Sequence, residues 1–156
     1  MSDADHLARA IALARDAMRS NRGGPFGAVV VRDGVVLGEG ANSVLATSDP
    51  TAHAEVVAIR AACAHIGTFR LDGATIYASS EPCPMCLAAI YWSRLERIVY
   101  AAACDVAAAA GFDDTFFYDE LRLEPAARRV PMRQDDSPDA RALFEEWKRK
   151  PDKTPY

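Results

Sequence analysis

Two short motifs in this chain combine residue types that bind zinc in proteins. The first is His53-Ala54-Glu55, and the second is Pro82-Cys83-Pro84-Met85-Cys86. Each motif stands where a predicted helix begins, and free backbone N–H groups at a helix start favour a thiolate over a thiol. Two thiolates and one imidazole suit a tetrahedral zinc ion, provided that the two helix starts face each other. The sequence therefore predicts one Zn²⁺ held by His53, Cys83 and Cys86.

Three protein ligands leave the fourth position of a tetrahedral zinc ion open. Structural zinc is normally closed by four protein ligands, whereas catalytic zinc keeps a water and lowers its pKa from about 16 toward about 7. Glu55 stands two residues after His53, so on a helix its side chain cannot share the direction of that ligand. We expect Glu55 to leave the metal alone and to act as a general acid and base. The spacing thus indicates a hydrolytic zinc enzyme.

Other interpretations of the cysteine pair have to be weighed. On their own, Cys83 and Cys86 would also suit a redox pair or part of a structural zinc site. A structural site needs a fourth ligand, and the pairing of both motifs at helix starts favours catalytic zinc instead. The remaining cysteines and histidines are expected to lie outside the site, with Cys63 and Cys104 as small packed residues and His6 and His65 at the surface.

The hydrophobic pattern predicts the elements that position these motifs. Apolar residues three or four apart over 7–18 indicate an N-terminal helix, and apolar runs at 28–31 and 35–37 flank Asp33-Gly34, a pair typical of tight hairpin turns. The segment 38–51 is rich in turn-forming residues and is expected to be a loop that delivers Asn42. Further helices are expected over 53–66, 83–93, 105–110 and 139–150, and further strands over 74–78, 97–102 and 128–132.

Length and composition limit the class of protein. Strands alternating with helices predict an α/β layered fold, and 156 residues suit a single domain over 1–156. No apolar run approaches about 20 residues and no secretory signal opens the chain, so we expect no membrane segment and a cytoplasmic location. The net charge of −4 argues against a nucleic-acid partner, which would call for a basic surface.

Across nearly its whole length, the chain resembles the cytidine deaminase superfamily, and within it the bacterial guanine deaminases. The pairing of His-x-Glu with Pro-Cys-x-x-Cys is the signature of zinc nucleobase deaminases. The zinc motifs are superfamily-wide, whereas Gly111-Phe112-Asp113-Asp114 and a chain ending in Tyr156 are more typical of the guanine branch. The resemblance rests on residues 23–29, 49–55, 81–86, 89–92 and 110–114.

This resemblance implies a three-layer α/β/α domain with a five-stranded mixed sheet and one Zn²⁺ per subunit. It implies a homodimer in which the C-terminal segment, about 133–156, is exchanged and helps to close the partner's site. The implied reaction converts guanine and water to xanthine and ammonia. The implied roles are hydrogen bonding to the purine by Asn42, substrate binding by Ala54, stacking on its plane by Phe26 and Trp92, and substrate recognition or proton transfer by Asp114 and Tyr156.

Three other functions compete with this one. The chain could deaminate another amino-heterocycle, such as a triazine, cytosine or guanosine. A transfer-RNA adenosine deaminase would use the same zinc motif, but it would need a basic surface for phosphate contacts, which this acidic chain does not favour. A zinc-stabilised interaction module would perform no turnover, and it would not need Glu55.

Overall fold

The computed structural model describes residues 1–155 of the chain, which divides after Asp114 into two compact units. The first unit contains a four-stranded sheet of order β2-β1-β3-β4. Strand β1 is antiparallel to β2 and β3, and β3 is parallel to β4, so the sheet is mixed. The elements of this unit are α1 (Asp3–Arg19), β1 (Gly27–Arg32), β2 (Val35–Ala41), α2 (Val44–Thr47), α3 (Ala54–Ile66), β3 (Thr75–Ser80), α4 (Pro84–Trp92), β4 (Arg97–Ala102) and α5 (Cys104–Ala109).

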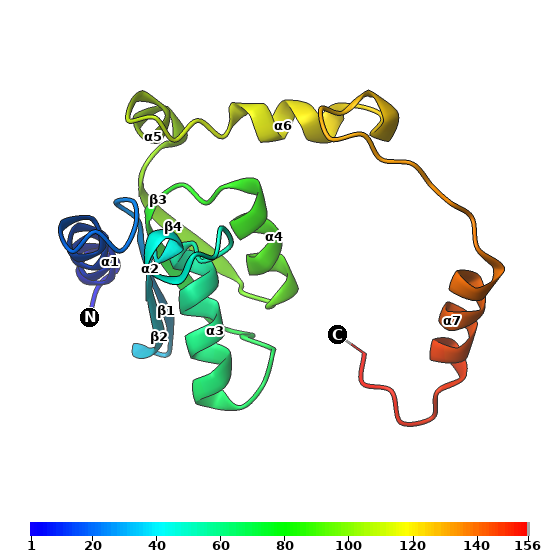
Figure 1. Ribbon diagram of the computed structural model, residues 1–156. Helices are drawn as coiled ribbons and strands as arrows, with labels where there is room; N and C mark the ends of the chain where they lie inside the picture. The colour runs from blue at the N-terminus through cyan, green and yellow to red at the C-terminus, as the bar shows by residue number, and fades with distance from the viewer. Residues whose placement is uncertain (156) are drawn as a thin grey trace. The chain divides into compact units, whose positions relative to one another are not determined.

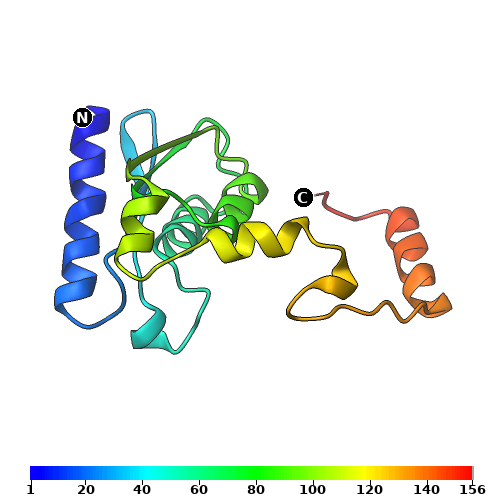
Figure 2. The same cartoon turned by 90° about the horizontal axis from the view of Figure 1, so that it is seen from above.

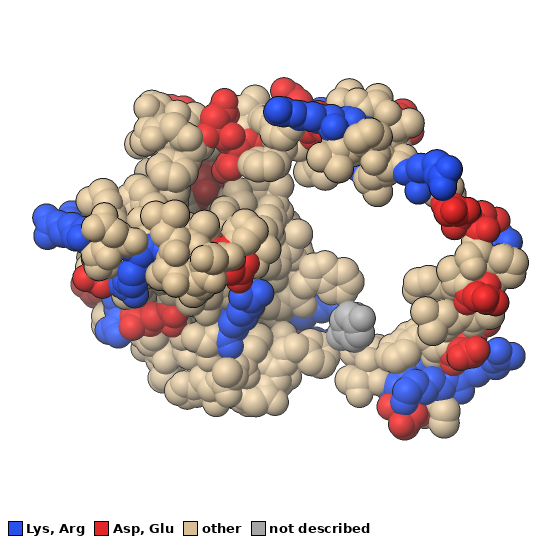
Figure 3. Space-filling model, in the orientation of Figure 1, with Lys and Arg blue, Asp and Glu red and all other residues tan. Residues whose placement is uncertain are grey.

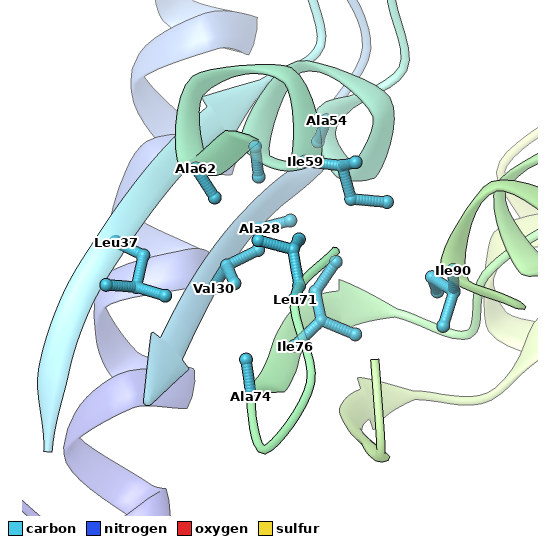
Figure 4. Packing of buried hydrophobic residues seen from close by; sticks show 11 residues of the cluster. Ala28, Val30, Leu37, Ala54, Ile59, Ala62, Leu71, Ala74, Ile76 and Ile90 are labelled. Atoms are coloured by element: carbon cyan, nitrogen blue, oxygen red, sulfur yellow. The ribbon is translucent and has the colours of Figure 1, made fainter. Parts of the chain in front are cut away.

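Helices cover both faces of the sheet, α1 on one side and α3 with α4 on the other (Figures 1 and 2). Alternation along β1 explains this layering, because successive side chains of a strand point to opposite faces. Val29 and Val31 pack with Ala10 of α1. Ala28 and Val30 pack in the larger cluster beneath α3, which Figure 4 shows from close by. The α/β class with helices on both faces is therefore confirmed.

The hairpin between β1 and β2 is confirmed, but the loop expected from residue 38 is wrong at its start. Asp33 and Gly34 have φ angles of 53° and 75°, as a tight turn requires. Strand β2 then continues to Ala41. Gly40 resembled a turn residue, yet a Cβ there would lie 2.0 Å from the carbonyl oxygen of Ala54. The glycine instead allows α3 to lie close against the strand.

The sheet has four strands, so the fifth strand expected over 128–132 is wrong. A strand needs partners for its backbone N–H and C=O groups. Residues 128–132 belong to the second unit, which contains no strand within 115–155 to provide them, and Pro131 has no N–H to donate. The elements of this unit are α6 (Thr115–Arg122), the 3₁₀ turn η1 (Pro125–Ala127) and α7 (Pro138–Arg149).

The second unit has no core of its own in the part that is described. Neither α6 nor α7 has a buried residue, and α7 exposes Leu143, Phe144 and Trp147. A segment without a core is not an independent domain, so one domain over the whole chain stays a prediction. None of the helices within residues 1–155 is long and apolar enough to cross a membrane.

Two positions expected from the sequence are wrong. His6, expected at the surface, is 2% exposed and its ring packs on that of Tyr77, with centroids 4.8 Å apart. The reason is helical spacing, because His6 lies four residues before Ala10 on the buried face of α1. Cys104, expected to be packed, is exposed at the start of α5, a helix without buried residues.

A polar network fixes the start of α1 to the sheet. The carboxylate of Asp3 accepts hydrogen bonds from the Tyr77 hydroxyl at 2.7 Å and from the Arg97 guanidinium at 2.8 and 2.9 Å. These hydrogen bonds, those of Arg97 first, lower the pKa of Asp3 to about 2. The first turn of α1 is thereby tied to β3 and β4.

Candidate active site

The two zinc motifs come together at the starts of α3 and α4. His53 is the N-cap of α3 and Cys83 the N-cap of α4, with Pro84 in the first turn, where a missing N–H is tolerated. Cys86 follows one turn into α4 and is fully buried. The Nδ1 atom of His53 lies 3.6 Å from Sγ of Cys83 and 3.5 Å from Sγ of Cys86. The predicted ligands therefore converge on one point.

The spacing of these three atoms fits a zinc ion. With Zn–S bonds of about 2.3 Å and Zn–N bonds of about 2.0–2.1 Å, tetrahedral angles place nitrogen and sulfur about 3.6 Å apart. The observed separations match this value, and all three ligand atoms lie within 4.8 Å of one another. Glu55 is not part of this group of metal ligands.

Hydrogen bonding shifts the pKa values of the two thiols in opposite directions. The pKa of Cys83 falls to about 4, mainly because its thiolate accepts a hydrogen bond from Cys86. The same hydrogen bond, together with burial, raises the pKa of Cys86. The imidazole of His53 is hydrogen-bonded to Cys83, which raises its pKa. A divalent cation would replace these shared protons, since zinc binds thiolates and neutral imidazole.

Glu55 places a buried carboxyl group beside the metal ligands. It lies in the first turn of α3 and is 5% exposed. Its Oε2 atom lies 3.3 Å from Sγ of Cys86. Burial, which removes the carboxylate from water, is the main reason that its pKa is raised. A carboxyl group held in this way is a stronger proton acceptor than an exposed glutamate, which suits a general acid and base.

A small cavity opens in front of the metal ligands and Glu55. Phe26 and Phe112 form part of its wall and meet edge to face, with ring centroids 4.9 Å apart. Burial, followed by the nearby charge of Cys83, raises the pKa of Asp114. Aromatic walls with a few acidic groups suit a flat, polar heterocycle. The lining residues are Phe26, His53, Glu55, Ser80, Glu81, Cys83, Ala107, Phe112 and Asp114.

Three of the other expected substrate contacts, Asn42, Ala54 and Trp92, are not among the described residues that line this cavity. Asn42 is buried at the end of β2, where its N–H donates to the carbonyl oxygen of Phe26 at 2.9 Å. Ala54 is fully buried in the first turn of α3. Trp92 ends α4, is 62% exposed, and does not appear in the cavity wall formed by residues 1–155. Tyr156 lies outside the described residues.

Four lining residues had no role assigned from the sequence, namely Ser80, Glu81, Ala107 and Phe112. Glu81 precedes Pro82 directly, but a carboxylate before a helix is equally explained by the helix dipole. Phe112 belongs to the motif Gly111-Phe112-Asp113-Asp114, but the sequence predicts no role for its side chain. No feature of the sequence points to Ala107, because its position in the wall depends on how α5 folds back toward the metal ligands.

These features define the class of protein. Three protein ligands for one zinc ion, beside a buried acid in a small cavity, are the arrangement of a hydrolytic zinc enzyme. Residues 1–102 match the model of the cytidine and deoxycytidylate deaminase zinc-binding region. The chain belongs to this family of zinc-binding deaminases.

Among individual proteins, guanine deaminase of Bacillus subtilis matches this chain over its full length. The guanine deaminase of Bacillus subtilis (strain 168) is 45% identical over 156 residues, which cover 100% of both chains. The X-ray structure of guanine deaminase from Bacillus subtilis matches with a TM-score of 0.97 over 100% of this chain and 99% of that one. NE0047, solved in complex with 2,6-diaminopurine, matches with a TM-score of 0.69 at 32% identity, over 72% of this chain and 63% of that one.

A second kind of relative shares only part of the chain. The tRNA-specific adenosine deaminase of Aquifex aeolicus (strain VF5) is 41% identical over 90 residues, which cover 56% of this chain and 60% of that protein. This partial match fits a zinc-binding region common to deaminases with different substrates.

Proposed function

We propose that this protein catalyses the hydrolytic deamination of guanine to xanthine and ammonia. The observation that carries the proposal is a buried carboxyl group, Glu55, beside a three-ligand zinc site in a cavity with aromatic walls. Full-length similarity to the guanine deaminase of Bacillus subtilis supports guanine as the substrate. Zinc, when bound, supplies a Lewis acid that makes water a nucleophile at neutral pH.

Glu55 carries the protons of the reaction. It accepts one proton of the attacking water while the water oxygen forms a bond to the ring carbon that bears the amino group. It passes this proton to the neighbouring ring nitrogen, whose double bond to that carbon opens. It then takes the proton of the new hydroxyl group and delivers it to the amino group, so that the carbon–nitrogen bond breaks, ammonia leaves and a carbonyl group remains. The raised pKa of the buried carboxyl group suits this work, because it makes Glu55 a stronger proton acceptor than an exposed glutamate. Glu55 ends each cycle unchanged.

Substrate recognition uses the polar and aromatic groups around this centre. The Oδ1 atom of Asn42 accepts the N–H groups of Gly24 at 3.2 Å and Val44 at 3.3 Å, which leaves its Nδ2 group to donate to the purine. Phe26 stacks on the purine plane, and Asp114 takes part in recognition or proton transfer. Ala54, Trp92 and Tyr156 complete the proposed substrate contacts.

The protein works as a homodimer in which about residues 133–156 are exchanged between subunits. A segment as short as the second unit, with no buried residue in its helices, is not stable alone. Its apolar side chains need a partner surface, and a second copy offers the exposed residues of α4. The exposed apolar residues concerned are Tyr91 and Trp92 on α4, and Phe116, Phe117, Leu121, Leu143, Phe144 and Trp147 on α6 and α7.

Glu55→Gln tests the reaction, because the amide keeps the size of the side chain but cannot carry the proton. Deamination of guanine, followed as xanthine and ammonia, should fall by about 10⁴-fold, the upper end for general acid–base catalysis. Zinc content should be unchanged, since the three ligands remain. Retained turnover would overturn the role of Glu55, and a wild-type protein inactive on guanine would overturn the substrate.

A substrate panel separates the competing activities. The panel contains guanine, guanosine, cytosine, a triazine and transfer RNA, each offered to zinc-loaded protein. Guanine should give the highest kcat/KM. On the face shown in Figure 3, Lys and Arg side chains are interspersed with Asp and Glu side chains, which does not favour extended contacts to RNA phosphates.

Subunit complementation tests the exchange. Tyr156→Ala protein keeps Glu55, whereas Glu55→Gln protein keeps Tyr156, so each is impaired alone. If the C-terminal segment closes the partner's site, mixed dimers combine an intact Glu55 with an intact Tyr156 in one site and regain activity. Mixing without any gain, although light scattering shows dimers, would contradict the exchange.

A further inference from the structure

Glu81 makes two hydrogen bonds to the junction between β4 and α5. Its backbone N–H donates to the carbonyl oxygen of Ala102 at 2.8 Å, and its Oε2 atom accepts the N–H of Cys104 at 3.1 Å. Cys104 is the first residue of α5, and the N-cap of that helix, Ala103, has no side chain that could accept a hydrogen bond. Glu81, which directly follows β3, therefore supplies the cap that the local sequence lacks.

The helix that Glu81 caps carries one wall of the cavity. Ala107 of α5 lines it directly. After the helix, Gly111 has a φ of 95° and turns the chain back, so that the N–H of Phe112 donates to the carbonyl oxygen of Ala107 at 3.0 Å. The ring of Phe112 then meets that of Phe26 in the cavity wall. Residues 104–112 are thus attached at one end by Glu81 and at the other by the aromatic pair.

This wall is exposed along much of its length. None of the residues of α5 is buried, and residues 110–113 are exposed. Segments with few buried contacts open at low free energy, so single attachments have a large influence on their position. Glu81 itself also lines the cavity, so a change at this residue lies beside the proposed substrate site.

We propose that Glu81 is a positioning residue, whose carboxylate holds α5 and Phe112 where they shape the substrate cavity. It acts by accepting the Cys104 N–H and carries no proton in the reaction. The inference rests on the proposed guanine deamination for its kinetic part only. Glu81 sets substrate affinity, because the wall that it anchors contacts the substrate and not the metal ligands.

Two variants of Glu81 test this role in the zinc-loaded enzyme. Glu81→Ala removes the acceptor, whereas Glu81→Gln keeps an oxygen that can accept the same N–H. In Glu81→Ala, amide hydrogen exchange over 103–112, followed by mass spectrometry, should quicken at least tenfold, and KM for guanine should rise about tenfold with kcat within about threefold. Glu81→Gln should stay close to wild type in exchange and in both kinetic constants.

Glu96→Ala is the matched control. The carboxylate of Glu96 also accepts a backbone N–H, that of Gly73 at 2.9 Å, but it lies before β4 and outside the cavity wall. Its loss should leave exchange over 103–112 and KM unchanged. Unaltered exchange in Glu81→Ala would overturn the proposal. So would loss of zinc in that variant, or damage in Glu81→Gln as great as in Glu81→Ala. Because hydrogen exchange needs no turnover, these results stand apart from any failure of the enzyme to act on guanine.

Discussion

Gly40→Ala should damage the zinc site from a residue that touches neither metal nor substrate. Gly40 lies in β2, where a Cβ would stand 2.0 Å from the carbonyl oxygen of Ala54 and 2.5 Å from the backbone nitrogen of Ala58. Ordinary contacts of this kind are 3.4 Å or longer. The first turn of α3 would therefore have to move by about 1.4 Å, and it carries His53 and Glu55 with it.

The size of the effect follows from that displacement. Ligand distances in metal sites vary by only about 0.2 Å, so a shift several times larger separates His53 from the cysteine pair. We expect zinc affinity to fall at least tenfold, and kcat/KM at saturating zinc to fall about 100-fold, as is typical of a misplacement of about 1 Å. Overpacking should also lower the free energy of unfolding by about 2 kcal/mol, or Tm by about 4–8 °C.

Gly38→Ala separates the effect on the site from the loss of stability. A Cβ at Gly38 would meet the same helix with similar severity, 2.4 Å from the nitrogen of Ala62 and 2.5 Å from the carbonyl oxygen of Ala58. The clash lies further along α3, so Tm should fall as much while zinc affinity changes less than threefold. Zinc competition and thermal melts measure both quantities. Equal loss of zinc in the two variants would refute the local reasoning.

Two further results are expected. Because the folded state lowers the pKa of Asp3 to about 2, its network stabilises the protein fully above the ordinary value of 3.8 and is lost as pH falls toward 2. Thermal melts should therefore show Asp3→Asn less stable at neutral pH, with the gap to wild type closing between pH 4 and 2. Removal of zinc by a chelator should abolish deamination and expose Cys83 to alkylation, which peptide mapping detects, and added zinc should restore protection. Unchanged alkylation would argue against Cys83 as a ligand.

The part of the site that was predictable from sequence is the part fixed by local spacing. His53 and Glu55 are separated by a single residue, and Cys83 and Cys86 by one helical turn, so their relations within each motif follow from helix geometry alone. The distance between the two motifs does not follow from spacing. It was expected from the ligand requirement of zinc, because neither motif alone provides the three protein ligands of a catalytic zinc site.

Errors arose where a residue type has two uses. Gly40 could mark a turn or a close approach of helix to strand, and only the packing of α3 decides between them. His6 could face water or a neighbouring ring, and the apolar stripe of α1 had omitted it because histidine is polar. The residue types of 128–132 favour a strand, but a strand forms only where its backbone can pair with another strand. No partner strand lies in its unit within 115–155.

The order of the strands explains why residues far apart in the sequence meet at one edge of the sheet. Strand β1 is antiparallel to β2 and β3, so its first residue, Gly27, pairs with Ala41 at the end of β2, and Ala28 pairs with Ala78 near the end of β3. Strands β3 and β4 are parallel, so Ser80 pairs with Ala102 and both strands end at this same edge. The segments that follow or precede these ends carry Asn42, Phe26, the cysteine motif and α5. The strand order and the short connections of this sheet are therefore sufficient to bring the metal ligands, the aromatic walls and the cap of α5 to one edge.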